Sequence, residues 1–166
     1  MSSNIAPALK SLALPITDMH PDPHNARLHS QPNLDAIKLS LQAYGQRKPI
    51  VVNAATGVIE AGNGLWLAAR ELGWPEIAVV QVEDSPETAS GYAIMDNQSA
   101  LLAEWDLPTL KDLLQNLDTG AFDMDLTGFD AQALEELMTQ FQVDEEPVSE
   151  AESTKDSECP KCGYRW

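Results

Sequence analysis

The chain has 166 residues, a hydrophobic content of 43% and a formal net charge of -16, and this length suffices for one ordinary domain with a core of its own and an appendage. No run of eighteen apolar residues occurs, which excludes a transmembrane helix, and the first residues lack the long apolar core of a secretory signal, so we expect a cytoplasmic protein with no membrane partner. Residues 1–80 carry six basic and six acidic side chains, whereas residues 81–166 carry four and twenty. Because an acidic half repels the phosphate backbone, contact with nucleic acid must come from the neutral half, through Arg27, Lys38, Arg47, Lys48 or Arg70.

The neutral half predicts a leader, a helix and a hairpin. Residues 1–12 are expected to form a flexible leader, and the prolines at positions 21, 23 and 32 favour extended or turned backbone. Apolar residues recur at helical spacing from Leu34 to Tyr44, which predicts a helix over residues 33–43, with Asn33 as its N-cap and Gly45 as its end. Residues 50–53 and 58–61, joined by a turn that closes at Gly57, predict a β-hairpin.

The remainder of the chain predicts one more strand and several helices. A helix should follow Gly64 and stop before Pro75, and residues 77–82 are typical of a buried strand. Further helices are expected over residues 86–104, over residues 108–117 and after Asp130, a plausible N-cap. The expected domains are a leader (1–12), an α/β core (13–85), a helical extension (86–142), a disordered acidic linker (143–158) and a cysteine-containing terminus (159–166).

Several short segments carry residue types that suit a phosphate ligand. Gly62 and Gly64, on either side of Asn63, stand at a strand-to-helix junction, where backbone N–H groups and the helix N-terminus can bind an anion. Arg27, two residues after Asn25, can pair with phosphate oxygens. Each signal is weak alone, because a G-x-G is commonly only a tight turn and a lone arginine is mostly exposed.

A later segment offers groups for a metal ion. Asp96, beside Asn97 in an otherwise apolar helix, can hold Mg²⁺ between protein and phosphates. Glu60, close to the glycines, is the nearby candidate for a catalytic acid or base, although it could equally face out from its strand. Phosphoryl chemistry at this site would therefore use Asp96 and Glu60 as catalytic residues.

The order and spacing of these segments resemble the ParB N-terminal, or ParB/sulfiredoxin-like, superfamily, in the phage and prophage form that also occurs fused in front of DNA methyltransferases. The matching stretches are "NAR" at 25–27, "YGQRKPIVV" at 44–52, "GVIEAGNGLWLAARELGWPEIAVV" at 57–80, "DN" at 96–97 and "DLTGFDAQALEEL" at 125–137. The resemblance implies an α+β fold, a small mixed-sheet domain followed by a helical segment, that binds CTP or ATP with Mg²⁺. The nucleotide-binding residues implied are Asn25, Arg27, Gln46, Gly62, Asn63, Gly64 and Asn97.

The sequence departs from the family pattern at two charged positions. Leu65 stands where the glycine motif usually ends in arginine, and Gln98 follows Asn97 where relatives carry an arginine in the later motif. A charge-assisted hydrogen bond is worth roughly 1.5–3 kcal/mol, so losing two weakens a nucleotide about a hundredfold or more. This predicts a site of reduced affinity or without catalysis, unless Arg47 or Lys48, otherwise exposed loop cations, supplies the missing charge.

The resemblance leaves the function open, because the superfamily includes CTP-gated DNA clamps, nucleases, free-serine kinases and sulfinic acid reductases. The first hypothesis is a ParB-like nucleotide-binding protein of phage or prophage type that acts with DNA or DNA-processing proteins: nuclease-like, partition-like or a companion to methylation or packaging. If active as an enzyme, it would be a nuclease or a nucleotide phosphohydrolase, and a small-molecule kinase would need Glu60 as its catalytic acid. The alternative is a non-catalytic protein–protein interaction module whose leucine-striped helices after Pro108 bind a partner. The chain lacks the arginine-rich helix-turn-helix segment that DNA-sliding relatives carry, which argues against sequence-specific DNA reading by this chain alone.

The cysteines and histidines suggest separate chemistry. Cys159 and Cys162, in "CPKCG", have the spacing of a zinc-ribbon knuckle, but structural zinc takes four ligands. Either two chains share one zinc ion in a homodimer, or a partner supplies the other ligands, or the knuckle is an empty remnant. His20, His24 and His29 fit no metal-binding spacing, so they are surface residues or one of them hydrogen-bonds a ligand.

Overall fold

The computed structural model describes residues 4–139, and within this range five strands form one mixed sheet in the order β1-β5-β3-β4-β2. The strands are β1 (Ala13–Pro15), β2 (His20–Pro21), β3 (Ile50–Asn53), β4 (Val58–Ala61) and β5 (Glu76–Val82). β3 and β4 form the antiparallel hairpin expected from the sequence, β5 runs parallel to β3, and β1 and β2 complete the two edges. The expected α+β class is confirmed by this sheet and the helices around it.

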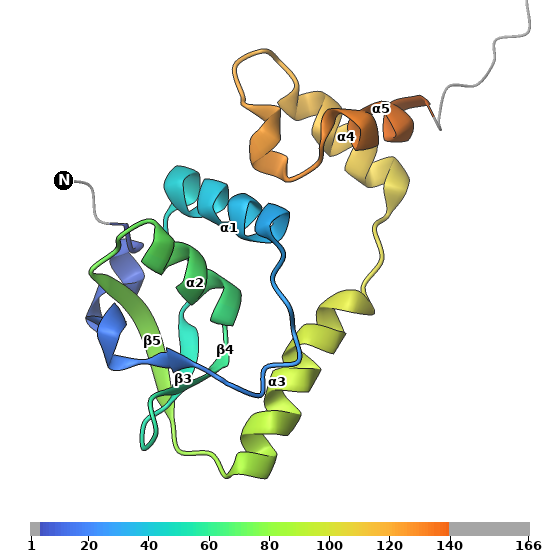
Figure 1. Ribbon diagram of the computed structural model, residues 1–166. Coiled ribbons are helices and arrows are strands. Elements are labelled where there is room, and N and C mark those ends of the chain that lie inside the picture. The colour runs from blue at the N-terminus through green and yellow to red at the C-terminus, as the bar shows by residue number, and fades with distance from the viewer. Residues whose placement is uncertain (1–3, 140–166) are drawn as a thin grey trace, which may run out of the picture.

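Of the five α-helices within residues 4–139, three lie around the sheet and two lie beyond it (Figure 1). α1 (Gln31–Tyr44) packs on α2 (Asn63–Glu71), and α3 (Pro86–Leu101) packs on β4. An extended segment then leads to α4 (Leu107–Leu117) and α5 (Ala131–Thr139), which Figure 1 shows as a separate small unit. Short 3₁₀ helices occur at η1 (Pro7–Leu12), η2 (Ile16–Asp18) and η3 (Met124–Thr127).

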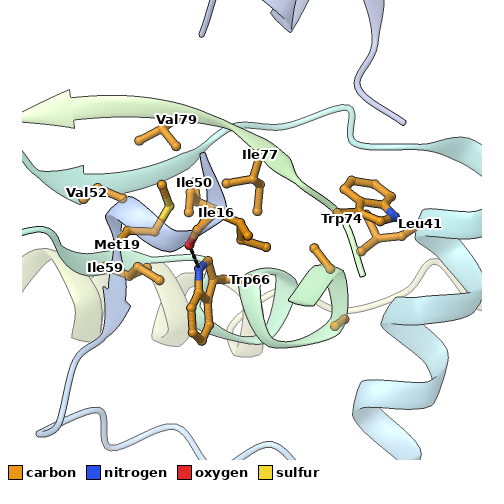
Figure 2. Packing of buried hydrophobic residues seen from close by; sticks show 12 residues of the cluster. Ile16, Met19, Leu41, Ile50, Val52, Ile59, Trp66, Trp74, Ile77 and Val79 are labelled. Atoms are coloured by element: carbon orange, nitrogen blue, oxygen red, sulfur yellow. Dashed lines mark hydrogen bonds between the residues drawn. The ribbon is translucent and has the colours of Figure 1, made fainter. Parts of the chain in front are cut away.

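The main core lies between the sheet and the helices α1 and α2 (Figure 2). Ile59 and Ile77 from the strands are fully buried, and the ring of Trp66 from α2 packs beneath them. The indole Nε1 of Trp66 donates a 3.1 Å hydrogen bond to the carbonyl oxygen of Ile16, which satisfies the polar atom of a buried aromatic side chain. This bond ties α2 to the segment between β1 and β2.

The α4–α5 unit has a small core of its own. Leu110 and Leu114 of α4 pack against Leu137 of α5. The hydroxyl of Tyr44 in the main domain donates a 3.3 Å hydrogen bond to the carbonyl oxygen of Leu126 in this unit. No helix within residues 4–139 is long and apolar enough to cross a membrane.

The structure differs from the sequence-based expectations at two places in the N-terminal part. Residues 4–12 do not form a loose leader: Ile5 is buried and bridges to Gln46, and η1 follows. α1 begins at Gln31 rather than at residue 33, because Ser30 is its N-cap and Pro32 fits the first turn of a helix.

The C-terminal elements follow the expected order. α3 ends at Leu101, three residues before its expected end. Asp130 is the N-cap of α5, since its carboxylate accepts a 2.7 Å hydrogen bond from the amide of Ala133. The acidic linker and the pair Cys159 and Cys162 lie outside the described residues.

Candidate functional site

A cavity of about 180 Å³ lies at the start of α2 and collects nearly all of the candidate site residues. It is formed where β4 ends, between α1, α3 and the segment before α1. The candidates that line it are Asn25, Arg27, Glu60, Gly62, Asn63, Gly64, Asp96 and Asn97, with His29, Ile37, Ala61 and Leu65 beside them. Residues separated by up to 72 positions in the sequence are therefore brought to one place.

Gly62 makes the sharp turn from β4 into α2. Its φ of 95° is in the left-handed region, and a Cβ atom there would lie 2.5 Å from the side chain of Ile50. Gly62 is the N-cap of α2, and no side chain caps this end of the helix. The first N–H groups of a helix have no intrahelical partner, so those of Asn63, Gly64 and Leu65 face the position where an anion would be held.

Gly64 allows close approach of an imidazole ring. A Cβ at this position would lie 2.6 Å from Cε1 of His29. The ring is held by a 2.8 Å hydrogen bond between His29 Nδ1 and Asn33 Oδ1. Asn33, expected as an N-cap, therefore orients a histidine at the cavity instead. His29 is a group that the sequence suggested only weakly, because its contact with Gly64 joins residues far apart in the chain.

The segment before α1 places Arg27 at the cavity. The side-chain oxygen of Asn25 accepts a 3.0 Å hydrogen bond from the backbone N–H of Arg27, which is a local turn of the Asx type. Asn63 anchors the same segment, since its Oδ1 accepts a hydrogen bond of 3.2 Å from the amide of Asp22 and its Nδ2 donates to the carbonyl of Ile59. Asn63 can therefore offer a ligand its backbone N–H, while its side chain holds the segment in place.

α3 contributes the two groups suited to a metal ion. Asp96 is exposed at the cavity rim and Asn97 is half-buried beside it. The Nδ2 of Asn97 donates a 2.8 Å hydrogen bond to the carbonyl of Ala93, so its Oδ1 is the atom that it can present to a cation. A carboxylate and an amide oxygen are ligands that Mg²⁺ accepts.

Glu60 lies at an irregularity of the hairpin. Val51 pairs with Ala61, but Val52 pairs with Ile59, so Glu60 is the extra residue of a β-bulge. Its side chain is 4% exposed. Its Oε1 accepts a 3.1 Å hydrogen bond from Asn53 Nδ2, whereas its Oε2 is buried with no hydrogen-bond partner among the described residues.

Three candidate residues lie elsewhere. Gln46 is fully buried, and its side-chain amide bonds the backbone N–H and carbonyl of Ala78 at 2.7 and 2.9 Å. It therefore joins the chain after α1 to β5, outside the cavity. Arg47 lies over the ring of Tyr44, and it and Lys48 line a different hollow, on the other side of Leu65.

The charges around the cavity do not favour binding of a phosphate group that has no metal ion bound to it. Of the described residues that line it, Glu60 and Asp96 carry negative charge and Arg27 carries positive charge. A polyphosphate would gain from the N–H groups of α2 and from Arg27 but would be repelled by the two carboxylates. A divalent cation placed among them would reverse that repulsion.

Comparison with known proteins identifies the fold. The structure matches the C-terminally truncated chromosome-partitioning protein ParB from Caulobacter crescentus in complex with CTP-γ-S, with a TM-score of 0.58 and 16% identity over 76% of this chain and 83% of that chain. The same protein complexed to the centromeric parS site matches with a TM-score of 0.42 and 16% identity, over 80% of this chain and 73% of that chain. A search of curated proteins finds no significant match.

The sequence also matches a domain family. Residues 108–161 match the family described as the ParB-methyltransferase HTH domain. A segment that matches a helix-turn-helix family therefore follows the core, although it is not the arginine-rich segment whose absence the sequence analysis noted. This segment contains no arginine, and it holds fourteen Asp or Glu and three Lys.

The protein is thus a small α+β protein in two parts. The first is the mixed sheet with its helices and the cavity at a strand-to-helix junction, and the second is the helical segment after it. The fold of the chain is similar to that of the solved ParB, and residues 108–161 match the ParB-methyltransferase HTH domain family.

Proposed function

We propose that this chain is a nucleotide-binding ParB-like protein that acts in a DNA-related process, and that its cavity at the start of α2 binds a nucleoside triphosphate with Mg²⁺. The observation that supports this most is the convergence of Arg27, Asp96 and the uncapped N-terminus of α2 on one cavity. The solved ParB with the same fold is complexed with CTP-γ-S, which makes CTP the first nucleotide to test, with ATP next.

The residues present fit a magnesium–nucleotide complex. Mg²⁺ is commonly bound through one or two carboxylates and the phosphates of its ligand, and Asp96 with Asn97 offers such a set. The N–H groups of Asn63, Gly64 and Leu65 would bind phosphate oxygens, and Arg27 would add a charge-assisted pair. When bound, the ion would neutralise the phosphates beside the two carboxylates.

The affinity should be modest. Leu65 and Gln98 stand at positions where relatives carry arginine, and Arg47 and Lys48 do not line the cavity. Without these two arginines the affinity for a nucleotide should be about a hundredfold lower. The fraction of sites occupied should therefore change with the concentration of free nucleotide. Whether it also cleaves the nucleotide, or cuts nucleic acid, depends on Asp96 and Glu60, the candidate catalytic residues. The phage or prophage setting and a role beside methylation or packaging machinery remain part of this proposal.

Isothermal titration of the full chain with CTP, ATP and GTP, each with Mg²⁺ and with a chelator, tests the proposal. Arg27→Ala should weaken binding about tenfold or more, because it removes a charge-assisted contact. Arg70→Ala is the matched control, since that guanidinium lies over Trp66, away from the cavity. Equal affinities in the two variants, or no nucleotide bound below about 10 mM, would contradict the proposal.

Duplex DNA in the same titrations tests the second half of the proposal. The acidic α4–α5 unit is unsuited to phosphate contact, so any binding should come from the neutral half and weaken in Arg47→Ala or Lys48→Ala, whose side chains are exposed. Binding that survives both substitutions and is instead lost when residues 107–166 are removed would contradict this assignment.

The alternative function, a protein–protein interaction module, is favoured by one observation. Leu113 and Leu117, one helical turn apart on α4, are 57% and 39% exposed, and Trp105 is 67% exposed nearby. Under this alternative the chain has no use for a nucleotide, so the titration above separates the two functions.

A further inference from the structure

A second cavity, of about 360 Å³, lies between the β3–β4 hairpin and the first turns of α3. Its volume is in the range of small-molecule sites. Its wall is apolar at Val58, Ile59 and Pro86, and its polar lining includes Asp22, Asp84 and Glu60. The described residues that line it include no lysine or arginine, but His24 is among them, with its Nδ1 3.7 Å from Asp22 Oδ1.

The buried carboxylate of Glu60 is the unusual feature of this cavity. The bulge places Glu60 outside the regular ladder of the hairpin, and Asn53 fixes one of its oxygens at 3.1 Å. Asn53 is itself held, because its Nδ2 also donates to the carbonyl of Asp84 at 3.1 Å and its Oδ1 accepts from Ala55. The other oxygen, Oε2, is buried and has no partner among the described residues. A buried carboxylate is costly unless a donor or a positive charge meets it.

The acidic groups are not arranged for a metal ion. No cluster of three or more His, Cys, Asp or Glu in residues 4–139 is close enough to hold one. Instead, carboxylates are distributed around a partly apolar space, which suits a larger cation whose N–H groups can reach separate acceptors. An ammonium or guanidinium group on a short carbon chain has this form.

We propose that this hairpin cavity binds a small organic cation, an amine or guanidine, whose charged group pairs with the carboxylate of Glu60. Its carbon chain lies on the apolar wall, and a second N–H group reaches Asp22 or Asp84. The proposal is independent of nucleotide binding, although Glu60 borders both cavities, so a bound cation would also remove the charge that repels phosphate in the neighbouring cavity.

Agmatine and putrescine are the probes for calorimetric titration of the full chain, with 1,4-butanediol and succinate as neutral and anionic counterparts. We expect one saturable site for a cation, with a Kd of about 1 mM or below, and none for the diol or the diacid. Glu60→Gln, which keeps the shape of the side chain, should weaken cation binding about tenfold or more. Glu76→Gln is the matched control, because Glu76 is exposed on β5, outside this cavity.

A second variant guards against a folding defect in the first. Ala89 of α3 lines the hairpin cavity but not the cavity at the start of α2, so Ala89→Leu should fill the space and abolish cation binding while leaving the titration with CTP unchanged. Arg27→Ala should leave cation binding unchanged, which separates this proposal from the preceding one. The proposal is overturned if neither cation binds, if the diol binds as well as putrescine, or if Glu60→Gln and Ala89→Leu both bind the cations like the unmodified chain.

Discussion

Restoring an arginine at Leu65 is the most direct test of why this site should be weak. Leu65 is half-buried, lines the cavity at the start of α2 and packs against the main core. A guanidinium at the third position of α2 would lie beside the phosphates, where a charge-assisted hydrogen bond is worth about 1.5–3 kcal/mol. A positive charge at a helix N-terminus costs about 0.3–1 kcal/mol. The net effect should be an affinity for CTP with Mg²⁺ about tenfold higher in Leu65→Arg.

The substitution should also lower stability. Complete burial of a leucine contributes about 1.5–3 kcal/mol, so exchanging a half-buried one for the stem of an arginine should cost about 1 kcal/mol. Leu67→Arg is the matched control, since Leu67 is equally half-buried on α2 but does not line the cavity. Calorimetry measures the affinity, and a denaturant titration measures the free energy of unfolding. A folded Leu65→Arg variant with unchanged affinity, or an equal gain in Leu67→Arg, would refute the reasoning.

Three further substitutions test the fold that positions the site. Gln46→Ala should lower the free energy of unfolding by about 3 kcal/mol, because it leaves the buried N–H and carbonyl of Ala78 without partners; an effect below about 1 kcal/mol would argue against this role. Gly62→Ala should destabilise the protein by more than about 1 kcal/mol and weaken nucleotide binding, since a Cβ would collide with Ile50 at a positive φ; a calorimetric titration beside thermal melting measures both. Asp130→Ala should cost about 1 kcal/mol through loss of the α5 cap, and the loss should appear in the α4–α5 unit while the main domain melts as before.

The sequence predicted the elements whose signals are local. The hairpin of β3 and β4 was found with its bounds, because alternation and the turn at Gly57 are both short-range patterns. The convergence of Arg27, Asp96 and the glycine turn was also anticipated, since the ordered motifs of a known family place them together. α1 starts two residues before the expected position, because proline, which ends or breaks a helix at most positions, is well accommodated in the first turn, where Pro32 lies.

The features that escaped the sequence depend on tertiary contacts. The sequence predicts Gln46 as a nucleotide-binding residue, whereas its side chain bonds the backbone of Ala78 in β5. A sequence does not distinguish a glutamine that bonds a buried strand from one that binds a ligand. The bulge at Glu60 inserts one extra residue into the pairing of β3 with β4. The alternation of apolar and polar residues along a strand does not indicate where such an insertion occurs. The docking of Ile5 beside Gln46 likewise joins two segments that share no periodic pattern.

The two hydrophobic clusters described above should make this chain unfold in more than one cooperative step. Trp66 and Trp74 are buried in the larger cluster, whereas the ring of Trp105 lies tilted by 57° to that of Phe129 in the smaller one, with ring centroids 6.1 Å apart. Because tryptophans and helices occur in both parts, indole fluorescence and helical circular dichroism will each report on both parts during denaturation. A single denaturation midpoint for the whole chain would describe neither part. The stability of the sheet domain and that of the α4–α5 unit should therefore be measured in separate variants, in each of which the tryptophans of the other part are replaced by phenylalanine.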